Sequence, residues 1–448
     1  MEIIITLAFL AAALIAVFIG LAPWRNVARY ESPQPAAPTD ADSGDDIDAA
    51  PGRRPDTTCD SPADAGLPKV SVVAFVLRDE ENLTPYVDML LGQNYPDYEV
   101  ILVCDASAEA TAMLSEKFED TPNLKLTFIP PGSHNLSRRK LAQTLGIKRA
   151  EGEVVVTTST SVMPRGEEWL RALVGQMADP EVDVVCGYVH PEFDDYRGMW
   201  KWYRQFDATL TAAQWMDAAI KGNPYRGDGY NLAFRRRLFF EAKGYSSTLT
   251  LMDGDDDIFI HEICAPGHGR LALSPDSTVD TRWGEDANRI HNDLKDRYRF
   301  TRRWLPKLPF LRAGMLSAIQ WLMLIQFLAA LTGIAMLIVH LLPGVFGEAS
   351  AAITRMLAAT FPSVGNEPTA FTDTISMRLL SLIICNLLIP ICTWGAEILT
   401  YRTLARRLGS IRLFIAVVPF MLLRPLRNFM FALRHYPTRK SHFTWVRS

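Results

Sequence analysis

Four short apolar runs constrain the fold of this chain more than any other feature. They are rich in β-branched residues and occupy residues 70–77, 98–103, 124–129 and 154–158. Segments with helical character separate them and end near Leu91, Phe118 and Arg149. Strands that alternate with helices form right-handed βαβ units. We therefore predict an α/β domain with a mainly parallel sheet covered on both faces.

The carboxyl ends of these predicted strands carry polar side chains. Open sheets of this kind bind ligands beyond the carboxyl ends of their strands. Arg78, Asp105 and Ser159 fall at those ends. The alternative for Asp105 is a turn residue without a ligand.

An unusually acidic run occupies residues 251–260, with four aspartates within five positions. Aspartate disfavours strand and helix interiors, so the run fits a loop that leads into a helix. Like charges this close need a counterion, a cation or a shared proton. Two interpretations stay open: a solvated acidic cap, and a site that holds an ionised carboxylate beside a substrate hydroxyl.

Further motifs follow one another in a recognisable order. They are Arg78-Asp79-Glu80, Asp105-Ala106-Ser107, Arg139-Lys140-Leu141-Ala142, Glu151-Gly152-Glu153, Gly227-Asp228-Gly229-Tyr230-Asn231 and Gly254-Asp255-Asp256. In this order the chain resembles the family 2 inverting glycosyltransferases, which have a Rossmann-like GT-A fold. The layout is closest to that of the membrane-anchored bacterial members related to the cellulose, chitin and hyaluronan synthases.

The resemblance implies a sugar transfer from a nucleotide-sugar, most often a UDP-sugar, to a glycan or lipid-linked acceptor. It implies that Asp256 is the catalytic base and Asp255 its acidic neighbour. It places Gly229 and Asn231 on the acceptor side. The implied donor contacts are Arg78, Glu80, Asp105, Arg139, Lys140, Ser159, Ser161, Arg297 and Arg299. For Arg139 and Lys140 a solvated helix face is the alternative, and for the glycines an ordinary loop.

Two motifs depart from the family pattern. Ser159-Thr160-Ser161 stands where the family has Asp-x-Asp, and hydroxyls are poor ligands for the Mg²⁺ or Mn²⁺ that the family uses. The metal is then held differently, arginines replace it, or the domain binds a donor or partner without turnover. The Gln-x-x-Arg-Trp motif of processive synthases is also incomplete, although Arg297 and Arg299 remain near its position.

Long uncharged segments flank the predicted domain. Residues 3–24, 313–347 and 379–396 are long enough to span a bilayer, whereas residues 413–423 are too short and suit the interface. Residues 402–447 contain ten basic and no acidic residues, which favours a cytoplasmic C-terminus. We expect a multi-pass protein of the bacterial inner membrane with its N-terminus outside and its catalytic domain cytoplasmic.

The expected order is an anchor at residues 1–29, an acidic disordered linker at 30–67, the GT-A domain at 68–304 and a membrane region at 305–448. The linker contains nine acidic residues, two basic residues and six prolines between residues 31 and 66, too polar a composition to fold. The formal net charge of −4 argues against bulk nucleic-acid binding. The six cysteines show no CxxC pair or zinc spacing, as expected of reduced thiols.

Overall fold

The computed structural model describes residues 11–12, 14–33, 66–76, 83–105, 108–129, 137–193, 198–248, 251–281, 287–360 and 368–435. Arg78 and Glu80 therefore lie outside the described residues. The chain divides into two compact units. The sheet unit is built mainly of Arg29–Lys307, and the helical unit of Leu308–Arg407 and Ile411–Leu433 together with Met1–Ala28.

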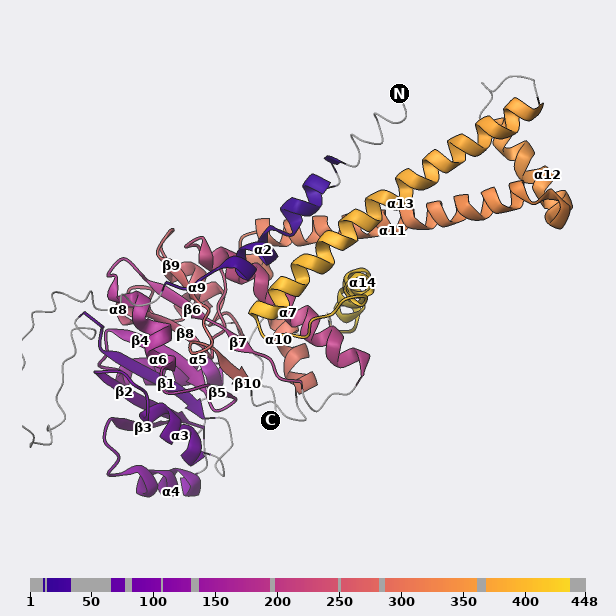
Figure 1. Ribbon diagram of the computed structural model, residues 1–448. Helices are drawn as coiled ribbons and strands as arrows, with labels where there is room; N and C mark the ends of the chain where they lie inside the picture. Colours follow the sequence, from indigo (N-terminus) through magenta and orange to yellow (C-terminus); the bar gives the residue numbers. More distant parts are fainter. Residues whose placement is uncertain are drawn as a thin grey trace, which may run out of the picture. The chain divides into compact units, whose positions relative to one another are not determined.

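The sheet unit contains a seven-stranded sheet of order β3-β2-β1-β4-β8-β6-β9 (Figure 1). Neighbouring strands are parallel except that β8 runs antiparallel to both β4 and β6. The strands are β1 (Val70–Val76), β2 (Tyr98–Cys104), β3 (Leu124–Phe128), β4 (Val154–Ser159), β6 (Val184–Gly187), β8 (Leu232–Arg235) and β9 (Gly269–Ala272). The four predicted strands and the α/β class are thus confirmed.

A second, three-stranded sheet has the order β5-β10-β7. It consists of β5 (Val162–Pro164), β7 (Val189–His190) and β10 (Val279–Thr281). The helices of the sheet unit are α3 (Leu83–Leu91), α4 (Ala108–Phe118), α5 (Arg138–Arg149), α6 (Trp169–Val174), α7 (Met199–Ile220), α8 (Arg236–Glu241), α9 (Ile258–Ile263) and α10 (Ala287–Thr301).

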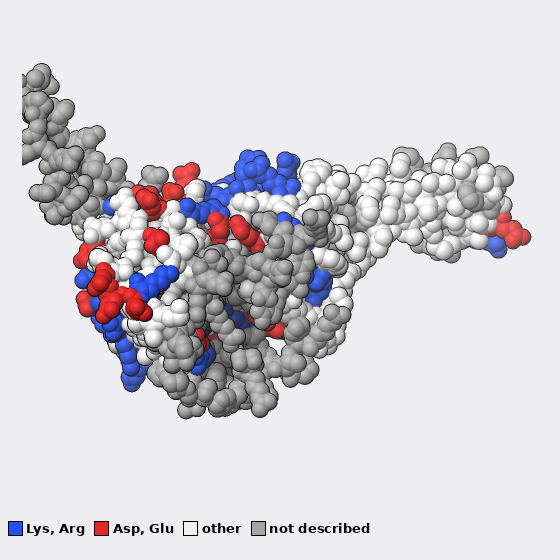
Figure 2. Space-filling model, turned by 90° about the horizontal axis from the view of Figure 1, so that it is seen from below, with Lys and Arg blue, Asp and Glu red and all other residues white. Residues whose placement is uncertain are grey.

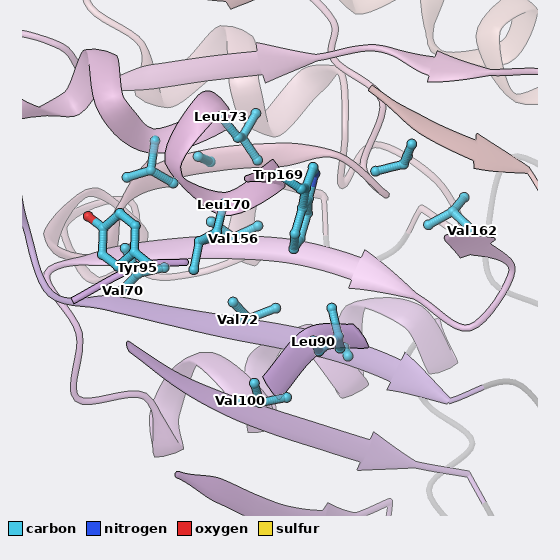
Figure 3. Packing of buried hydrophobic residues seen from close by; sticks show 14 of the residues in the cluster. Val70, Val72, Leu90, Tyr95, Val100, Val156, Val162, Trp169, Leu170 and Leu173 are labelled. Carbon is cyan, nitrogen blue, oxygen red and sulfur yellow. The ribbon is translucent and has the colours of Figure 1, made fainter. Parts of the chain in front are cut away.

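Valine-rich strands build the core of the sheet unit. All seven residues of β1 are buried, as expected of a central parallel strand covered on both faces. On one face, Trp169 and Leu170 of α6 lie over Val156 of β4, with Val72 and Val100 on the next two strands (Figure 3). This continuous apolar layer fixes the ends of β1, β2 and β4 relative to one another.

Polar groups join the amino ends of the same strands. Ser71 Oγ donates to Glu99 Oε1 at 2.6 Å across the β1–β2 pair, and the Glu151 backbone N–H donates to the same oxygen at 2.6 Å. Lys125 Nζ lies 2.6 Å from Glu99 Oε2. Burial alone would raise the pKa of Glu99, but Lys125 and Ser71 hold it below its usual value. Hydrogen bonds and a salt bridge thus hold together the amino ends of these strands, opposite the carboxyl ends where polar side chains were predicted.

The helical unit contains α2 (Ala22–Arg29), α11 (Leu308–Leu341), α12 (Pro343–Thr360), α13 (Pro368–Arg407) and α14 (Val417–His435). Trp24 of α2 packs edge-on against Tyr401 of α13, with ring centroids 6.5 Å apart. Gln320 donates to Glu397, and Trp394 Nε1 donates to Gln320 Oε1 at 3.2 Å, inside the α11–α13 pair. In Figure 2 this unit is white along most of its length and shows charged atoms at its end.

Among the described residues, α11 is the one helix long and apolar enough to cross a membrane. The expected span at residues 379–396 lies within α13, and residues 1–10 and 13 of the expected anchor lie outside the described residues. Between α11 and that span, residues 348–360 belong to α12 and residues 368–378 to the start of α13. The interfacial segment expected at 413–423 begins later, as α14.

The beginning of the expected linker is held by the sheet unit. Tyr30 donates its hydroxyl proton to the Leu271 carbonyl at 2.8 Å, and the Leu273 N–H donates to Ser32 Oγ at 2.6 Å. Residues 34–65 lie outside the described residues.

Gly152 provides a test of this fold. A Cβ atom there would lie 2.6 Å from the backbone nitrogen of Ser71, which cannot move without disturbing β1. We expect Gly152→Ala to lower the free energy of unfolding by about 1–3 kcal/mol, as overpacking does. Thermal unfolding of the purified protein measures it. Gly166→Ala is the matched control, since no atom lies within 4 Å of its added Cβ; equal effects of the two changes would contradict the packing.

Candidate active site

The acidic loop is buried, so the interpretation as a solvated cap was wrong. Asp253, Asp255, Asp256 and Asp257 are between 1% and 6% exposed. Gly254 adopts a φ of +108°, which a glycine tolerates best, and so lets the chain turn between the first two aspartates. Asp257 then caps α9 by accepting the Ile258 backbone N–H at 2.7 Å. The loop needs compensating charge, because buried carboxylates are costly alone.

Two arginines from distant helices supply that charge. Arg139 of α5 lies 2.7 Å from Asp255 (Nε to Oδ2) and 3.5 Å from Asp256 (Nη2 to Oδ2). Arg297 of α10 donates to Asp256 Oδ2 at 2.7 Å and lies 3.3 Å from Asp253 Oδ1. Asp256 therefore lies between two guanidinium groups.

These charges shift the protonation equilibria of the site. Burial alone would raise the pKa of Asp256, but Arg297 and Arg139 hold it below its usual value. Burial raises the pKa of Asp257 to about 6, with the Asp256 carboxylate adding to the effect. The same two causes raise the pKa of Asp228 to about 6. One carboxylate is thus firmly ionised beside two that hold protons more tightly.

Lys140, expected to contact the donor, binds backbone carbonyls instead. Its Nζ donates to the carbonyls of Thr248, Leu251 and Asp253 at 2.6, 2.8 and 2.9 Å. An ammonium has three N–H donors, so none is left for a diphosphate. Burial lowers the pKa of Lys140 to about 8. This corrects the expected donor contact: Lys140 fastens the acidic loop to α5.

Gly229 connects the end of β4 to the acidic loop. Its carbonyl accepts from Thr157 Oγ1 at 2.9 Å. A Cβ atom on Gly229 would lie 2.1 Å from Arg139 Nη2 and 2.9 Å from the Asp256 Cβ. The glycine therefore permits the close approach that the sequence motif suggests. Tyr230, the next residue, places its ring 4.5 Å from the Arg139 guanidinium carbon.

Asn231, the other residue expected on the acceptor side, holds the scaffold. Its side chain is fully buried, accepts from Trp169 Nε1 at 3.0 Å and donates to the carbonyls of Tyr188 and Ser277 at 2.9 and 2.8 Å. These bonds join the loop to α6 and to the segments beside β7 and β10.

Asp105 ends β2 and forms a two-bonded ion pair, but with Arg138 rather than with its neighbour Arg139. Arg138 Nε donates to Asp105 Oδ2 at 2.7 Å, and Arg138 Nη2 bonds the other oxygen. Arg299 is exposed on α10, on the face away from Arg297.

The serines at the end of β4 do not resemble a metal site. Ser159 Oγ and Ser161 Oγ lie 3.0 Å apart and share a hydrogen bond. Within the described residues, no group of three or more His, Cys, Asp or Glu side chains could hold a metal ion. A divalent cation implied by the family resemblance therefore does not fit the residues at this position.

Sequence reasoning missed three residues behind the loop. Thr301 of α10 donates to Asp257, and Arg226 lies 4.0 Å from Asp257 Oδ2 and 3.7 Å from the Tyr298 ring centroid. Tyr298 and Thr301 follow Arg297 by one and four residues on α10. Residues four apart on a helix are neighbours on its surface, so this spacing could have indicated that Thr301 lies beside Arg297 at the site.

A family model matches the segment that contains this loop. Residues 71–259 match glycosyl transferase family 2. The matching segment runs from β1 into α9 and contains both Ser159-Thr160-Ser161 and Gly254-Asp255-Asp256. This confirms the family resemblance for that segment, at a level coarser than the cellulose, chitin and hyaluronan synthase group.

Two solved glycosyltransferases are similar to the chain. A mannosyltransferase from Pyrobaculum calidifontis, in complex with GDP-Man and Mn²⁺, has 17% identity and a TM-score of 0.46, covering 95% of this chain and 98% of its own. S. aureus TarS with UDP has 15% identity and a TM-score of 0.35, covering 56% of this chain and 70% of its own. The search of curated proteins found no match.

The raised pKa of Asp228 predicts a pH effect on stability. Because its folded pKa of about 6 exceeds the unfolded value of about 4, Asp228 favours folding below pH about 4, and this contribution is lost as pH rises to about 6. Asp228→Asn removes the titration. Relative to wild type, its unfolding free energy should rise over that interval by up to about 3 kcal/mol.

Thermal unfolding of the full-length protein at a series of pH values between about 4 and 7 measures this difference. A difference between variant and wild type that stays constant with pH would show that Asp228 titrates normally.

Proposed function

We propose that the protein is an inverting, membrane-bound glycosyltransferase that moves a sugar from a nucleotide-sugar to a hydroxyl of a glycan or lipid-linked acceptor. The observation that carries the proposal is Asp256: a buried, ionised carboxylate between Arg139 and Arg297, within the segment that matches glycosyl transferase family 2. A base and cationic groups within one small site are what such a transfer needs.

The proposed step is a single displacement. The acceptor hydroxyl oxygen attacks the anomeric carbon while its proton passes to Asp256. The bond between that carbon and the diphosphate oxygen breaks, and the nucleoside diphosphate leaves with the electron pair. Attack from the face opposite the leaving group inverts the anomeric centre.

The surrounding groups support this step in distinct ways. The arginines face the place where negative charge grows on the leaving diphosphate. Asp105, at the end of β2, is the proposed acceptor for a ring N–H of a uracil-like base, and Arg138 holds its carboxylate in a fixed orientation. Gly229 lets Arg139 and Asp256 approach the backbone closely, which keeps the base beside the cation.

We propose that the helical unit anchors the enzyme in the inner membrane, with the sheet unit on the cytoplasmic side, where nucleotide-sugars are made. Helix α11 is 34 residues long, and its most apolar window has a mean hydropathy of 2.5. Large apolar side chains such as Leu322, Ile325 and Leu328 are exposed on it, which suits contact with lipid. The basic C-terminal residues support the orientation.

Asp256→Asn tests the chemistry. The amide keeps the shape of the side chain but takes up no proton, so we expect turnover to fall about 10²- to 10⁴-fold while donor binding persists. The assay measures nucleoside diphosphate released from a panel of UDP- and GDP-sugars. Asp276→Asn, at an exposed turn, is the matched control and should act as wild type.

Transfer by Asp256→Asn at the wild-type rate would refute the role of this base. Wild-type protein that binds UDP or GDP without turnover of any donor would favour the alternative, a donor-binding subunit without activity. The replacement of Asp-x-Asp by Ser159-Thr160-Ser161 is what supports that alternative.

Membrane anchoring has its own test. We expect the full-length protein to remain with the membrane fraction after an alkaline carbonate wash and to enter solution with detergent. Release by carbonate alone would show peripheral attachment and contradict the spanning role of α11.

A further inference from the structure

The arginines beside the acidic cluster are less deeply buried than its carboxylates. The side chains of Arg139 and Arg297 keep 14% and 13% of their surface exposed, whereas those of Asp255 and Asp256 keep 2% and 3%. The 14% of Arg139 that stays exposed does not include its Nη1 and Nη2 atoms, which are buried.

Arg139 also carries donors without acceptors. Among the described residues, its Nη1 and Nη2 atoms are buried and have no hydrogen-bond partner. The contact from Nε to Asp255 Oδ2 is short, but Asp255 Oδ2 has no hydrogen bond either. The two groups therefore attract each other as charges without a well-formed bond. Buried donors in this condition cost free energy until an acceptor reaches them.

Gly229 links β4 to the Arg139 donors that lack an acceptor within the described residues. Gly229 touches both Thr157 of β4 and the Arg139 side chain. Ser159 follows Thr157 by two positions, about 7 Å along the strand. Arg139 and the serines at the end of β4 are thus linked through Thr157 and Gly229, and the serines provide no carboxylate to a metal ion.

We propose that Arg139 and Arg297 bind the donor diphosphate directly and take the place of a divalent cation. The inference rests on the proposed function, since it concerns the donor of the same transfer. Arginine suits the task because its planar group forms paired hydrogen bonds to phosphate oxygens and stays charged at any working pH.

The exchange has a consequence for the base. Arg297 and Arg139 hold the pKa of Asp256 below its usual value, so in this structure Asp256 is a weak base. A diphosphate accepts from the Arg139 N–H groups that have no partner in the described part of the chain and competes with Asp256 for the N–H group of Arg297. Its binding draws the arginines away, raises the basicity of Asp256 and so prepares it to take the acceptor proton. Donor binding and base activation are then one event.

The test measures binding of UDP, GDP, uridine and guanosine to the full-length protein by calorimetry, with EDTA and with added Mn²⁺ or Mg²⁺. We expect one of the two diphosphates to bind with nearly the same affinity in EDTA and in metal, and its nucleoside to bind more weakly. Arg139→Gln and Arg297→Gln should each weaken the diphosphate about 10- to 100-fold in EDTA. Neither should change nucleoside binding.

Controls separate charge from folding. Arg149→Gln removes an exposed arginine of the same helix α5 and should leave all affinities unchanged. Arg139→Lys and Arg297→Lys keep the charge without the paired bonds, and should lose part of the affinity. These Lys variants replace any Gln variant whose thermal midpoint shows that it is unfolded.

Diphosphate binding that disappears in EDTA and returns with Mn²⁺ or Mg²⁺ would overturn the inference and leave the proposed function standing. Metal-free binding that the Arg139 and Arg297 variants retain in full would also overturn it. Failure of UDP and GDP to bind under any of these conditions would overturn the proposed function as well.

Discussion

Buried carboxylates in one short loop impose the main constraint on the sheet unit. Removing one partner of a buried ion pair costs about 3–5 kcal/mol, because the other charge is left without compensation. The loop around Asp255 and Asp256 is therefore stable only while α5 and α10 both deliver their arginines to it. Helices α5 and α10, about 150 residues apart in the sequence, therefore meet at this loop. The arginines and carboxylates that they bring together form one charged network.

The scaffold supplies the precision that this arrangement needs. Gly146 lets α5 lie directly on Val73 of β1, where an added Cβ would come within 2.3 Å of the valine side chain. Arg139, two turns earlier on the same helix, is thus positioned by the apolar core. On the opposite side, Thr301 and Arg297 of α10 grip the adjacent Asp257 and Asp256. The site is held by one helix packed on the sheet and by another bound through charge.

The sequence predicted the parts of the fold that obey a simple period. The runs that became β1, β2 and β4 were clear because central strands of such a sheet are almost continuously apolar. Strand β8, only four residues long and antiparallel, and the two- and three-residue strands of the second sheet carry no such pattern. The contacts of the site were harder to predict than the strands. The basic run at the start of α5 is an example, because the sequence does not say which of its three cationic side chains contacts which group. Successive helix residues point about 100° apart. Arg138 therefore reaches Asp105, Arg139 reaches Asp255, and Lys140 reaches three carbonyls, a division that only the packed helix decides.

The loss of the Asp-x-Asp carboxylates acquires a meaning in this setting. In the proposed binding mode, carboxylates at the end of β4 would compete with the diphosphate for the same arginines. Serines avoid that competition and leave Arg139 and Arg297 available to the diphosphate. Under the proposed function, the same charges also promote product release, because Asp255 and Asp256 remain beside the arginines and compete with the nucleoside diphosphate for them. In this proposal, Asp255 and Asp256 pair with the arginines before the donor binds and pair with them again after transfer. The reaction cycle then needs no exchangeable metal ion.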